Sequence, residues 1–258
     1  MATSVITEVQ NSTLFGLRLT AGDIPGYDYI HKFGANPSIT TTLETVWAQG
    51  GIYTYPSDSG VTLYISSSEN TDAGKSINIS GLDENFLEKS VTITLDGTDA
   101  ETKTEITGHT WTRIFRAFNA GSTDLDGDVY IYEDDTVSAG VPDTATKIRA
   151  KIVAAEQQTQ LALYTIPANK IGCVNRASMS SGRNVDIDFK LYTRLFGGVF
   201  RLSYQWSTFR SNVIDRTDIP LTLPGKTDIE FRAITPSGTA SNVTAGFSVI
   251  TLDRYQGQ

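Results

Sequence analysis

Cysteine and histidine are almost missing from this chain, which has one Cys and two His among its 258 residues. The single Cys173 excludes an internal disulfide framework and a zinc site built from several cysteines. A Ser-His-Asp or Cys-His catalytic set would have to use His31 or His109, and the sequence contains neither a G-x-S-x-G elbow nor a Walker-type phosphate loop. We therefore expect a protein that is not an enzyme and that holds no cofactor and no metal ion.

Long apolar runs and an excess of positive charge are also missing. No stretch approaches the roughly 18 apolar residues that a membrane span needs, and the N-terminal segment lacks the basic flank and apolar run of a secretory signal. The formal net charge of −8 argues against a nucleic-acid binder, because such proteins usually carry a basic stripe. These absences predict a chain that binds neither a membrane nor a nucleic acid.

Charge is distributed unevenly along the chain. Residues 1–140 hold 7 Lys/Arg and 20 Asp/Glu, a balance of −13, whereas residues 141–258 hold 14 and 9, a balance of +5. The polar stretch 133–146 coincides with the change of sign. This pattern predicts an acidic N-terminal β region over residues 1–140 and a mildly basic C-terminal β-sandwich over residues 141–258. The alternative is that the charges are distributed by chance and only solvate separate faces of the protein.

Alternation of apolar and polar residues dominates the second half of the chain. Residues 185–193 and 199–207 both alternate, and Leu195–Gly198 supplies a turn between them, so these segments predict a β-hairpin with one buried face. The residues expected on that face are Val185, Ile187, Phe189 and Leu191 in the first strand and Phe200, Leu202, Tyr204 and Trp206 in the second. The same pattern near the C-terminus turns inward the side chains of Ile229, Phe231, Ala233, Phe247 and Val249.

The first half alternates with weaker contrast, in residues 90–95 and 128–133, and is rich in Thr, which favours strands. No window shows a convincing helical period. The intervening turns are rich in Gly, Asp, Asn and Ser. Many short strands at regular spacing predict an all-β fold, an antiparallel β-sandwich or jelly-roll-like architecture with two sandwich regions and little helix.

Acidic residues gather before and after the segment 129–132. Asp124, Asp126 and Asp128 have the alternate spacing of a calcium loop, but Val129 stands where that loop needs glycine and the twelfth position is Asp rather than Glu. A solvated Asp-Gly turn is the simpler interpretation. Glu133, Asp134 and Asp135 could pair with other carboxylates in a glycosidase, although acidic residues on loops are too common to favour this.

A basic row follows in residues 147–153, where apolar positions alternate with Lys147, Arg149 and Lys151. Because side chains alternate across a strand, the three cations are expected on its outward face, with none pointing into the core. They could contact an acidic partner surface. A strand face that is merely solvated is the competing explanation.

An aromatic cluster lies in the segment TVWAQGGIYTYP, residues 45–56. Trp47, Tyr53 and Tyr55 could pack in a core, contact another subunit or line a ligand groove, since aromatic side chains bury a large area at low entropic cost. The Gly-Gly pair between them would permit a bulge or a close approach of another chain. We take these three residues as candidate interface positions and leave the three roles open.

The order of several motifs resembles that of a group of virion structural proteins of tailed bacteriophages, many from aquatic hosts. The motifs are HKFGANPSITTTLETVWAQGGIYTYP, VTLYISSSENTDAG, RIFRAFNAGS, LALYTIPANKIG and PGKTDIEFRA, and together with the closing SNVTAGFSVITL they extend over residues 28–252. The resemblance implies a β-rich component of the particle, on the head surface or in the tail, and implies no catalytic residues.

The resemblance leads to a specific functional expectation. The first hypothesis is a capsid decoration or cement protein, made in the host cytoplasm, that binds the outer surface of the head and stabilises the lattice. Its partners would be the major capsid protein and copies of itself, as a homotrimer, and the basic row at 147–151 would face an acidic capsid surface. The alternative is a tail component, a fibre, spike or other structural tail protein that contacts host glycans.

Overall fold

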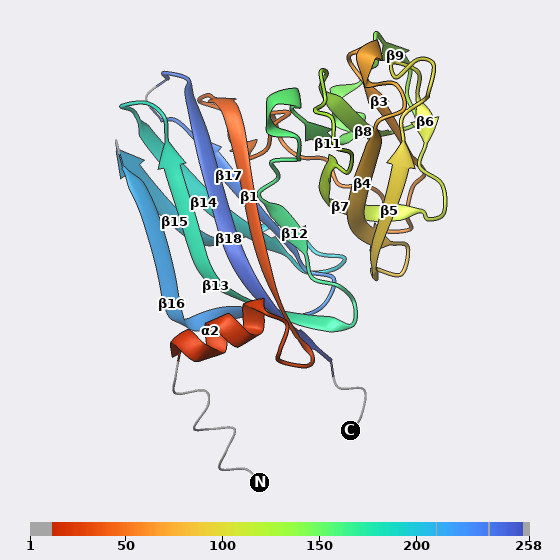
Figure 1. The fold of residues 1–258 in the computed structure, drawn as a ribbon. Helices are drawn as coiled ribbons and strands as arrows, with labels where there is room; N and C mark the ends of the chain where they lie inside the picture. Colours follow the sequence, from red (N-terminus) through yellow and green to blue (C-terminus); the bar gives the residue numbers. More distant parts are fainter. Residues whose placement is uncertain (1–11, 210, 237, 255–258) are drawn as a thin grey trace.

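A computed structural model describes residues 12–209, 211–236 and 238–254 of the chain. Within these ranges antiparallel strands are the dominant regular structure and helix is scarce, which confirms the all-β fold class predicted from the alternating segments. The strands form a large two-layered sandwich and a smaller lobe beside it (Figure 1). No helix among the described residues is long and apolar enough to span a membrane.

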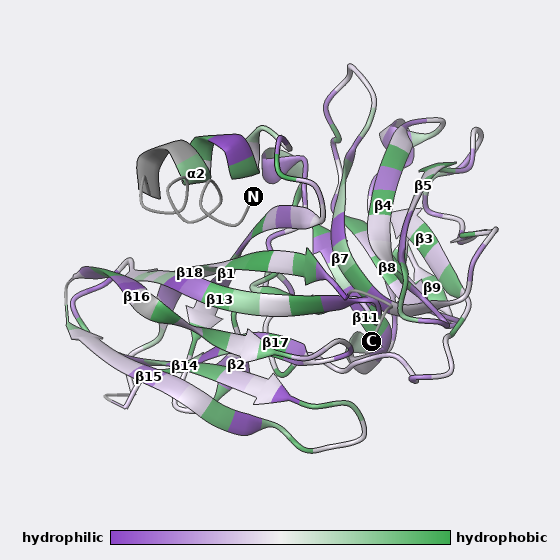
Figure 2. Ribbon diagram, turned by 90° about the horizontal axis from the view of Figure 1, so that it is seen from below, coloured by the Kyte–Doolittle hydropathy of each residue, from purple (hydrophilic) through white to green (hydrophobic). Residues whose placement is uncertain are grey.

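The sandwich consists of two sheets, seen nearly edge-on in Figure 2. Sheet A has the order β1-β18-β13-β16, and sheet B has the order β12-β17-β14-β15 with β2 paired to β17. The strands are β1 (Tyr27–Ile39), β2 (Glu44–Thr45), β12 (Leu163–Thr165), β13 (Lys170–Ser181), β14 (Asp186–Arg194), β15 (Arg201–Phe209), β16 (Asn212–Leu223), β17 (Asp228–Ile234) and β18 (Ser241–Asp253). Phe189, Phe231 and Phe247 meet in the core between the sheets, at the inward positions predicted for them.

The smaller lobe, called here the inserted lobe, consists of residues 47–161, which lie between β2 and β12 in the chain. Its sheets have the orders β11-β8-β3-β6 and β5-β4-β7, and β9 pairs with β10. Its elements are β3 (Leu63–Ser67), η1 (Asn70–Asp72), β4 (Ser76–Asp83), β5 (Glu88–Thr94), β6 (Thr104–Glu105), β7 (Trp111–Asn119), β8 (Val129–Glu133), β9 (Val137–Ser138), β10 (Val141–Pro142), η2 (Ala145–Lys147), β11 (Ile148–Ile152) and η3 (Ala154–Glu156). Ile65, Ile79, Trp111 and Ile131 lie in its core, which is separate from that of the sandwich.

Strand pairing does not follow the division that charge predicts at residue 140. Strand β1 pairs with β18, near the other end of the chain, and β11 pairs with β8 across the expected boundary. The hydrophobic cores divide instead near two neighbouring points, residues 46–47 and 161–163, although Leu82, Phe86 and Phe115 of the inserted lobe pack in the core of the sandwich. Alternation identifies strands but carries no information about their partners, and the charge balance does not identify the partners either.

The two ends of the inserted lobe lie side by side beneath β1. The Ala162 amide donates to the Val46 carbonyl at 3.0 Å, and Trp47 bridges to Leu161. Gly34 of β1 faces this pair so closely that a Cβ atom there would lie 2.2 Å from the Val46 oxygen and 2.4 Å from the Ala162 nitrogen. Glycine is therefore required for β1 to reach this position.

One helix, α2 (Ser12–Thr20), was not expected from the sequence. It lies next to β1, over the outer side of sheet A (Figure 2), where Leu19 is buried and Leu17 is exposed. The helix is short and contains Gly16, so its apolar residues are too few to reveal a helical period.

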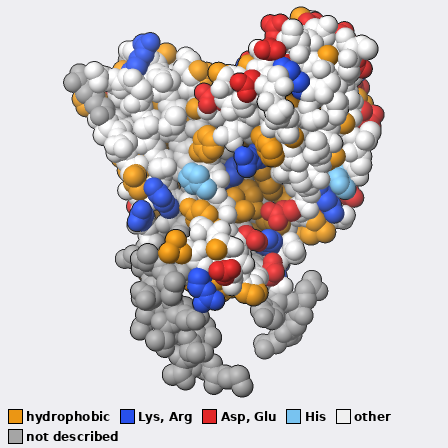
Figure 3. Space-filling view, viewed as in Figure 1, with side chains coloured by type: hydrophobic (Ala, Val, Ile, Leu, Met, Phe, Trp, Pro, Cys, Tyr) orange, Lys and Arg blue, Asp and Glu red, His pale blue; other side chains and the backbone are white. Residues whose placement is uncertain are grey.

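The two parts of the molecule meet along a hollow in which hydrophobic side chains gather (Figure 3).

The buried face predicted for β15 is only partly correct. Leu202 opposes Tyr192 while Tyr204 opposes Leu191, so Ser203 is an extra residue and forms a β-bulge. The bulge moves Leu202 to the opposite face from Tyr204, and both side chains are exposed. Strand β15 ends sheet B, so no further strand of that sheet lies beyond these two side chains.

Candidate functional site

The aromatic cluster lies inside the molecule rather than on its surface. Trp47 and Tyr53 are 2% and 3% exposed, and their rings meet edge to face at 5.0 Å. Tyr55 continues the row with its ring 4.8 Å from that of Tyr53. The Trp47 indole donates to the Gly51 carbonyl at 3.1 Å, which folds the Gly-Gly segment back on the ring. These contacts correspond to core packing, the first of the three roles left open by the sequence.

Beneath this cluster, the outer face of β17 carries two carboxylates that the inserted lobe covers. Asp228 is buried and bonds to two arginines, with Arg113 Nε at 2.7 Å from Oδ1 and Arg194 Nη2 at 2.6 Å from Oδ2. Thr165 donates to Asp228 Oδ1 at 2.5 Å. Arg113 belongs to β7 of the inserted lobe, so this ion pair joins the two parts of the molecule.

Glu230, two residues further along β17, is bound in a similar way. Thr45 donates to its Oε1 at 2.5 Å, Arg232 Nε lies 2.9 Å from the same atom, and the Tyr55 hydroxyl donates to Oε2 at 3.2 Å. Burial, together with the nearby carboxylates, raises the pKa of Tyr55 well above its usual value, so the hydroxyl remains a donor. The Arg113 guanidinium also lies 5.0 Å from the Tyr55 ring. We call the Asp228 and Glu230 groups the junction network, and its polar atoms are committed to one another.

A buried lysine provides a second contact between the two parts. Phe115 is an extra residue in β7, because Ser80 opposes Arg116 while Gly81 opposes Ile114. The carbonyl of Phe115 therefore accepts a hydrogen bond from the Lys32 ammonium of β1. Burial, reinforced by repulsion from Arg116, lowers the pKa of Lys32 to about 7.

Replacing Lys32 by methionine is expected to change the pH dependence of stability. The folded protein releases the Lys32 proton near pH 7, whereas the unfolded chain keeps it to about pH 10.5. The free energy of unfolding of the parent protein therefore rises with pH between these values. Below pH 7 the cost of burying the charged Lys32 ammonium, roughly 5 kcal/mol, applies in full. Loss of the bond to Phe115 costs about 1–3 kcal/mol. We expect Lys32→Met to be the more stable protein at pH 6, with the advantage gone by pH 10.

Urea unfolding at the two pH values measures this effect. Lys103→Met is the control, because that lysine is exposed and pairs with Asp134 on the surface. An equal change of unfolding free energy at pH 6 and pH 10 for Lys32→Met would contradict the assignment.

The basic row does not have the predicted orientation. Arg149 is only 3% exposed, so the expectation that none of the three cations points inward was wrong. A register shift between Ile148 and Ala150 makes Arg149 the extra residue of a bulge, and its side chain turns inward to Glu133 at 2.6 Å. Lys151 pairs with Asp128 at 2.8 Å, and Lys147 lies in η2.

The acids considered for calcium or glycoside chemistry are held in ion pairs. Asp126 lies 2.9 Å from Lys75, while Asp134 and Asp135 lie 2.6 and 3.1 Å from Lys103 and Lys147. Within the described ranges, no group of three or more His, Cys, Asp and Glu residues is arranged to hold a metal ion. These carboxylates act mainly to tie loops of the inserted lobe together.

Exposed apolar side chains lie in β15 and β16, the strands that end the two sheets on the same side of the sandwich. These side chains, which we call the open edge, are Leu202, Tyr204, Phe209, Ile214 and Ile219. Ile219, Ile214 and Leu202 are 83%, 57% and 49% exposed. The alternating pattern does not indicate this open edge, although one signal is present in the sequence, because Pro220 within an alternating segment is tolerated mainly in edge strands.

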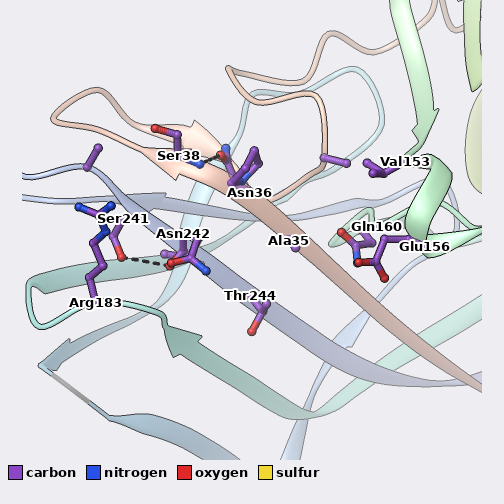
Figure 4. A pocket seen from close by; sticks show the side chains of 14 residues that line it. Ala35, Asn36, Ser38, Val153, Glu156, Gln160, Arg183, Ser241, Asn242 and Thr244 are labelled. Carbon is purple, nitrogen blue, oxygen red and sulfur yellow. Dashed lines mark hydrogen bonds between the residues drawn. The ribbon is translucent and has the colours of Figure 1, made fainter. Parts of the chain in front are cut away.

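A polar cleft lies at one end of the sandwich, where β1 and β18 meet the inserted lobe (Figure 4). It has a volume of about 540 Å³, within the roughly 300–1,000 Å³ usual for ligand sites. Its lining comes from residues 35–38 and 240–244 of the sandwich, Arg183 after β13, and Glu156 and Gln160 of the inserted lobe. The segments are far apart in the chain, so no sequence motif could have indicated this cleft.

Comparisons with known proteins give little information about this chain. No family model and no curated protein matches it. A solved structure of the Yersinia pseudotuberculosis-derived mitogen has a TM-score of 0.20 at 13% identity. This match covers 37% of this chain and 86% of the mitogen chain. Structures of infectious bursal disease virus strains Gt and Gx have TM-scores of 0.23 and 0.26 at 11% and 9% identity, covering 92% and 90% of this chain and 78% and 73% of theirs. TM-scores this low do not support an inference about function.

Proposed function

We propose that this chain is a structural protein of a tailed-phage particle, and specifically a decoration protein on the outer surface of the head. The resemblance of its ordered motifs to virion structural proteins supports the class. The connection of sandwich and inserted lobe through the junction network suits a protein that must keep its shape on a particle. We also propose that it does not catalyse a reaction, because the sequence contains no motif in which a nucleophile is paired with a histidine or acidic residue as its base.

The single observation that carries the assembly part of this proposal is the open edge. Monomeric soluble proteins rarely leave large apolar strips in water, and long unpaired edge strands tend to pair with other chains. Here both sheets of the sandwich end on the same side, in β15 and β16. A second copy of this chain offers two equivalent unpaired strands, and closed symmetry would cover all such edges at once. The occupant we propose is therefore another copy, in the homotrimer expected from the sequence.

The major capsid protein is the second proposed partner. Contact through the basic row remains a prediction, but it is weaker than the sequence alone indicated, because Lys147, Arg149 and Lys151 all have acidic partners within the chain. Exposed paired charges contribute about 0–1 kcal/mol each. Only repetition over a lattice would make such contacts significant.

Introducing two aspartates at the open edge is expected to separate the copies. Leu202→Asp together with Ile214→Asp places charges in the proposed contact, while both side chains are already exposed in the single chain. Surface substitutions usually change stability by less than about 0.5 kcal/mol, so the thermal midpoint of the separated chain should barely change. Light scattering should then show single 28.1-kDa chains instead of trimers, and copies per particle should fall at least tenfold.

Thr92→Asp together with Thr94→Asp is the matched control, since these residues are exposed on β5 of the inserted lobe. Trimers that survive the open-edge substitutions would contradict the assembly proposal. Gel densitometry of purified particles tests the location separately. Hundreds of copies per particle support decoration of the head, whereas a few to tens at one vertex would favour the alternative, a tail component.

A further inference from the structure

The polar cleft at the end of the sandwich contains polar side chains whose hydrogen-bonding groups the fold does not use. Glu156, Gln160, Arg183 and Asn242 all line it, and none of their side-chain polar atoms has a hydrogen bond or ion pair with the described part of the chain. By contrast, the neighbouring Asn36 is fully used, with Nδ2 donating to Thr45 and Oδ1 accepting from the Ser38 amide. The four free groups are therefore available to a ligand.

The free groups are placed on opposing walls. Arg183 lies on the sandwich side, and Glu156 and Gln160 lie on the side of the inserted lobe (Figure 4). A guanidinium without an acidic partner favours a carboxylate, which it can bind through two parallel hydrogen bonds. The Glu156 carboxylate accepts only, so it selects hydroxyl or amine donors at the other side. The ligand that fits carries an anionic group at one end and donors at the other.

A second hollow of about 430 Å³ adjoins the cleft along the outer face of sheet A and shares Ala35, Gln160 and Thr244 with it. Its floor includes Gly34 and Gly246, which carry no side chains, so an extended molecule can lie close to the backbone there. Phe33 stands at this hollow with its ring 40% exposed. An exposed ring beside polar groups provides an apolar platform for the flat face of a sugar.

The backbone of the floor helps to choose between ligand classes. Strands β1 and β18, which form the floor, are paired with each other from Tyr27↔Leu252 to Ile39↔Ser241. Strand β1 ends sheet A, so its other edge is not paired with another strand of the described residues, but Pro37 lies in the part of β1 that lines the cleft and cannot donate a ladder hydrogen bond to an extended peptide. Side chains with planar polar groups supply the hydrogen bonds instead, and hydroxyl-rich ligands use such groups well.

We propose that the cleft binds an acidic oligosaccharide, with a sugar carboxylate on Arg183, hydroxyl groups on Glu156, Gln160 and Asn242, and a further sugar ring against Phe33. Ile214 of the open edge lines the second hollow, but the four free groups of the cleft lie outside that edge, so binding by them does not depend on the proposed assembly. A failure to bind sugar would therefore leave the decoration proposal untouched, and the reverse also holds.

Calorimetric titration with an alginate hexasaccharide, a polymer of sugar carboxylates, tests the proposal on the full chain. Maltohexaose is the neutral probe, and we expect it to bind at least tenfold more weakly than the acidic one. Arg183→Gln should weaken binding of the alginate fragment about tenfold or more, as expected for loss of a charge-assisted pair. Arg201→Gln, an exposed arginine on β15, is the matched control and should bind like the parent protein.

Three outcomes would overturn the proposal. One is the absence of binding to either sugar at millimolar concentration. Another is equal affinity of the Arg183→Gln variant and the parent protein for the alginate fragment. The third is tighter binding of an acetylated octaglutamate peptide than of the hexasaccharide, which would assign the cleft to an acidic peptide. Thermal unfolding of each variant confirms that the fold is retained, since Arg183 is exposed and supports no other group.

Discussion

Replacing Asp228 by alanine is expected to lower the free energy of unfolding by about 3–5 kcal/mol, because removal of one partner leaves buried charges uncompensated. Arg113 and Arg194 would both lose their carboxylate, at sites where Asp228 now lies 2.7 and 2.6 Å away. Arg113 is buried and, among the described residues, would keep Asp58 alone as an acidic partner. The substitution also removes the acceptor of the Thr165 hydroxyl.

Chemical denaturation followed by tryptophan fluorescence measures this loss. Lys103→Met breaks the exposed pair with Asp134 and serves as the control, with an expected change of about 0–1 kcal/mol. Similar small changes for both variants would show that the junction network contributes little to holding the two parts together.

Gly34→Ala is expected to be at least as damaging, although it adds only one methyl group. That group would overlap the Val46 carbonyl and the Ala162 amide, which are backbone atoms and cannot rotate away. Overpacking of this kind usually costs about 1–3 kcal/mol and occasionally more, and we expect a loss above about 3 kcal/mol here, because both connections to the inserted lobe must shift.

Limited proteolysis gives a local reading of the same variant. Cleavage near residues 46 and 162 should accelerate, since the hydrogen bond between them is displaced. The control is Gly97→Ala, where a Cβ meets nothing within 4 Å and the backbone is not left-handed. If Gly34→Ala unfolds at the same denaturant concentration as Gly97→Ala, the close approach of β1 is not a constraint.

Alternation predicted the sandwich strands well, because burial on one face leaves a period of two that any single strand displays. Phe189, Phe231 and Phe247 are buried where this period places them. The period fails at bulges, which reverse it without any mark in the sequence. Ser203 exposes Leu202 in this way, and the bulge at Arg149 turns a predicted surface cation into a buried one.

Non-local contacts account for the rest of what sequence could not predict. Asp228 and Glu230 alternate with apolar residues as a solvated face would, and they do point away from the sandwich core. They are nevertheless buried, because Tyr55 and Arg113, from distant parts of the chain, cover them. The cleft is similar, since Glu156, Arg183 and Asn242 meet only after both parts have folded and no local pattern connects them.

The pairing of β1 with β18 has a consequence for synthesis on the ribosome. Tyr29 and Ser248, hydrogen-bonded across these strands, are 219 residues apart. At about 5–20 residues per second, β1 waits roughly 10–40 s for its partner strand to be made. During that interval the inserted lobe emerges complete, with both of its sheets and its own core. It can therefore fold first, and the two sheets of the sandwich then close beside a lobe that is already formed.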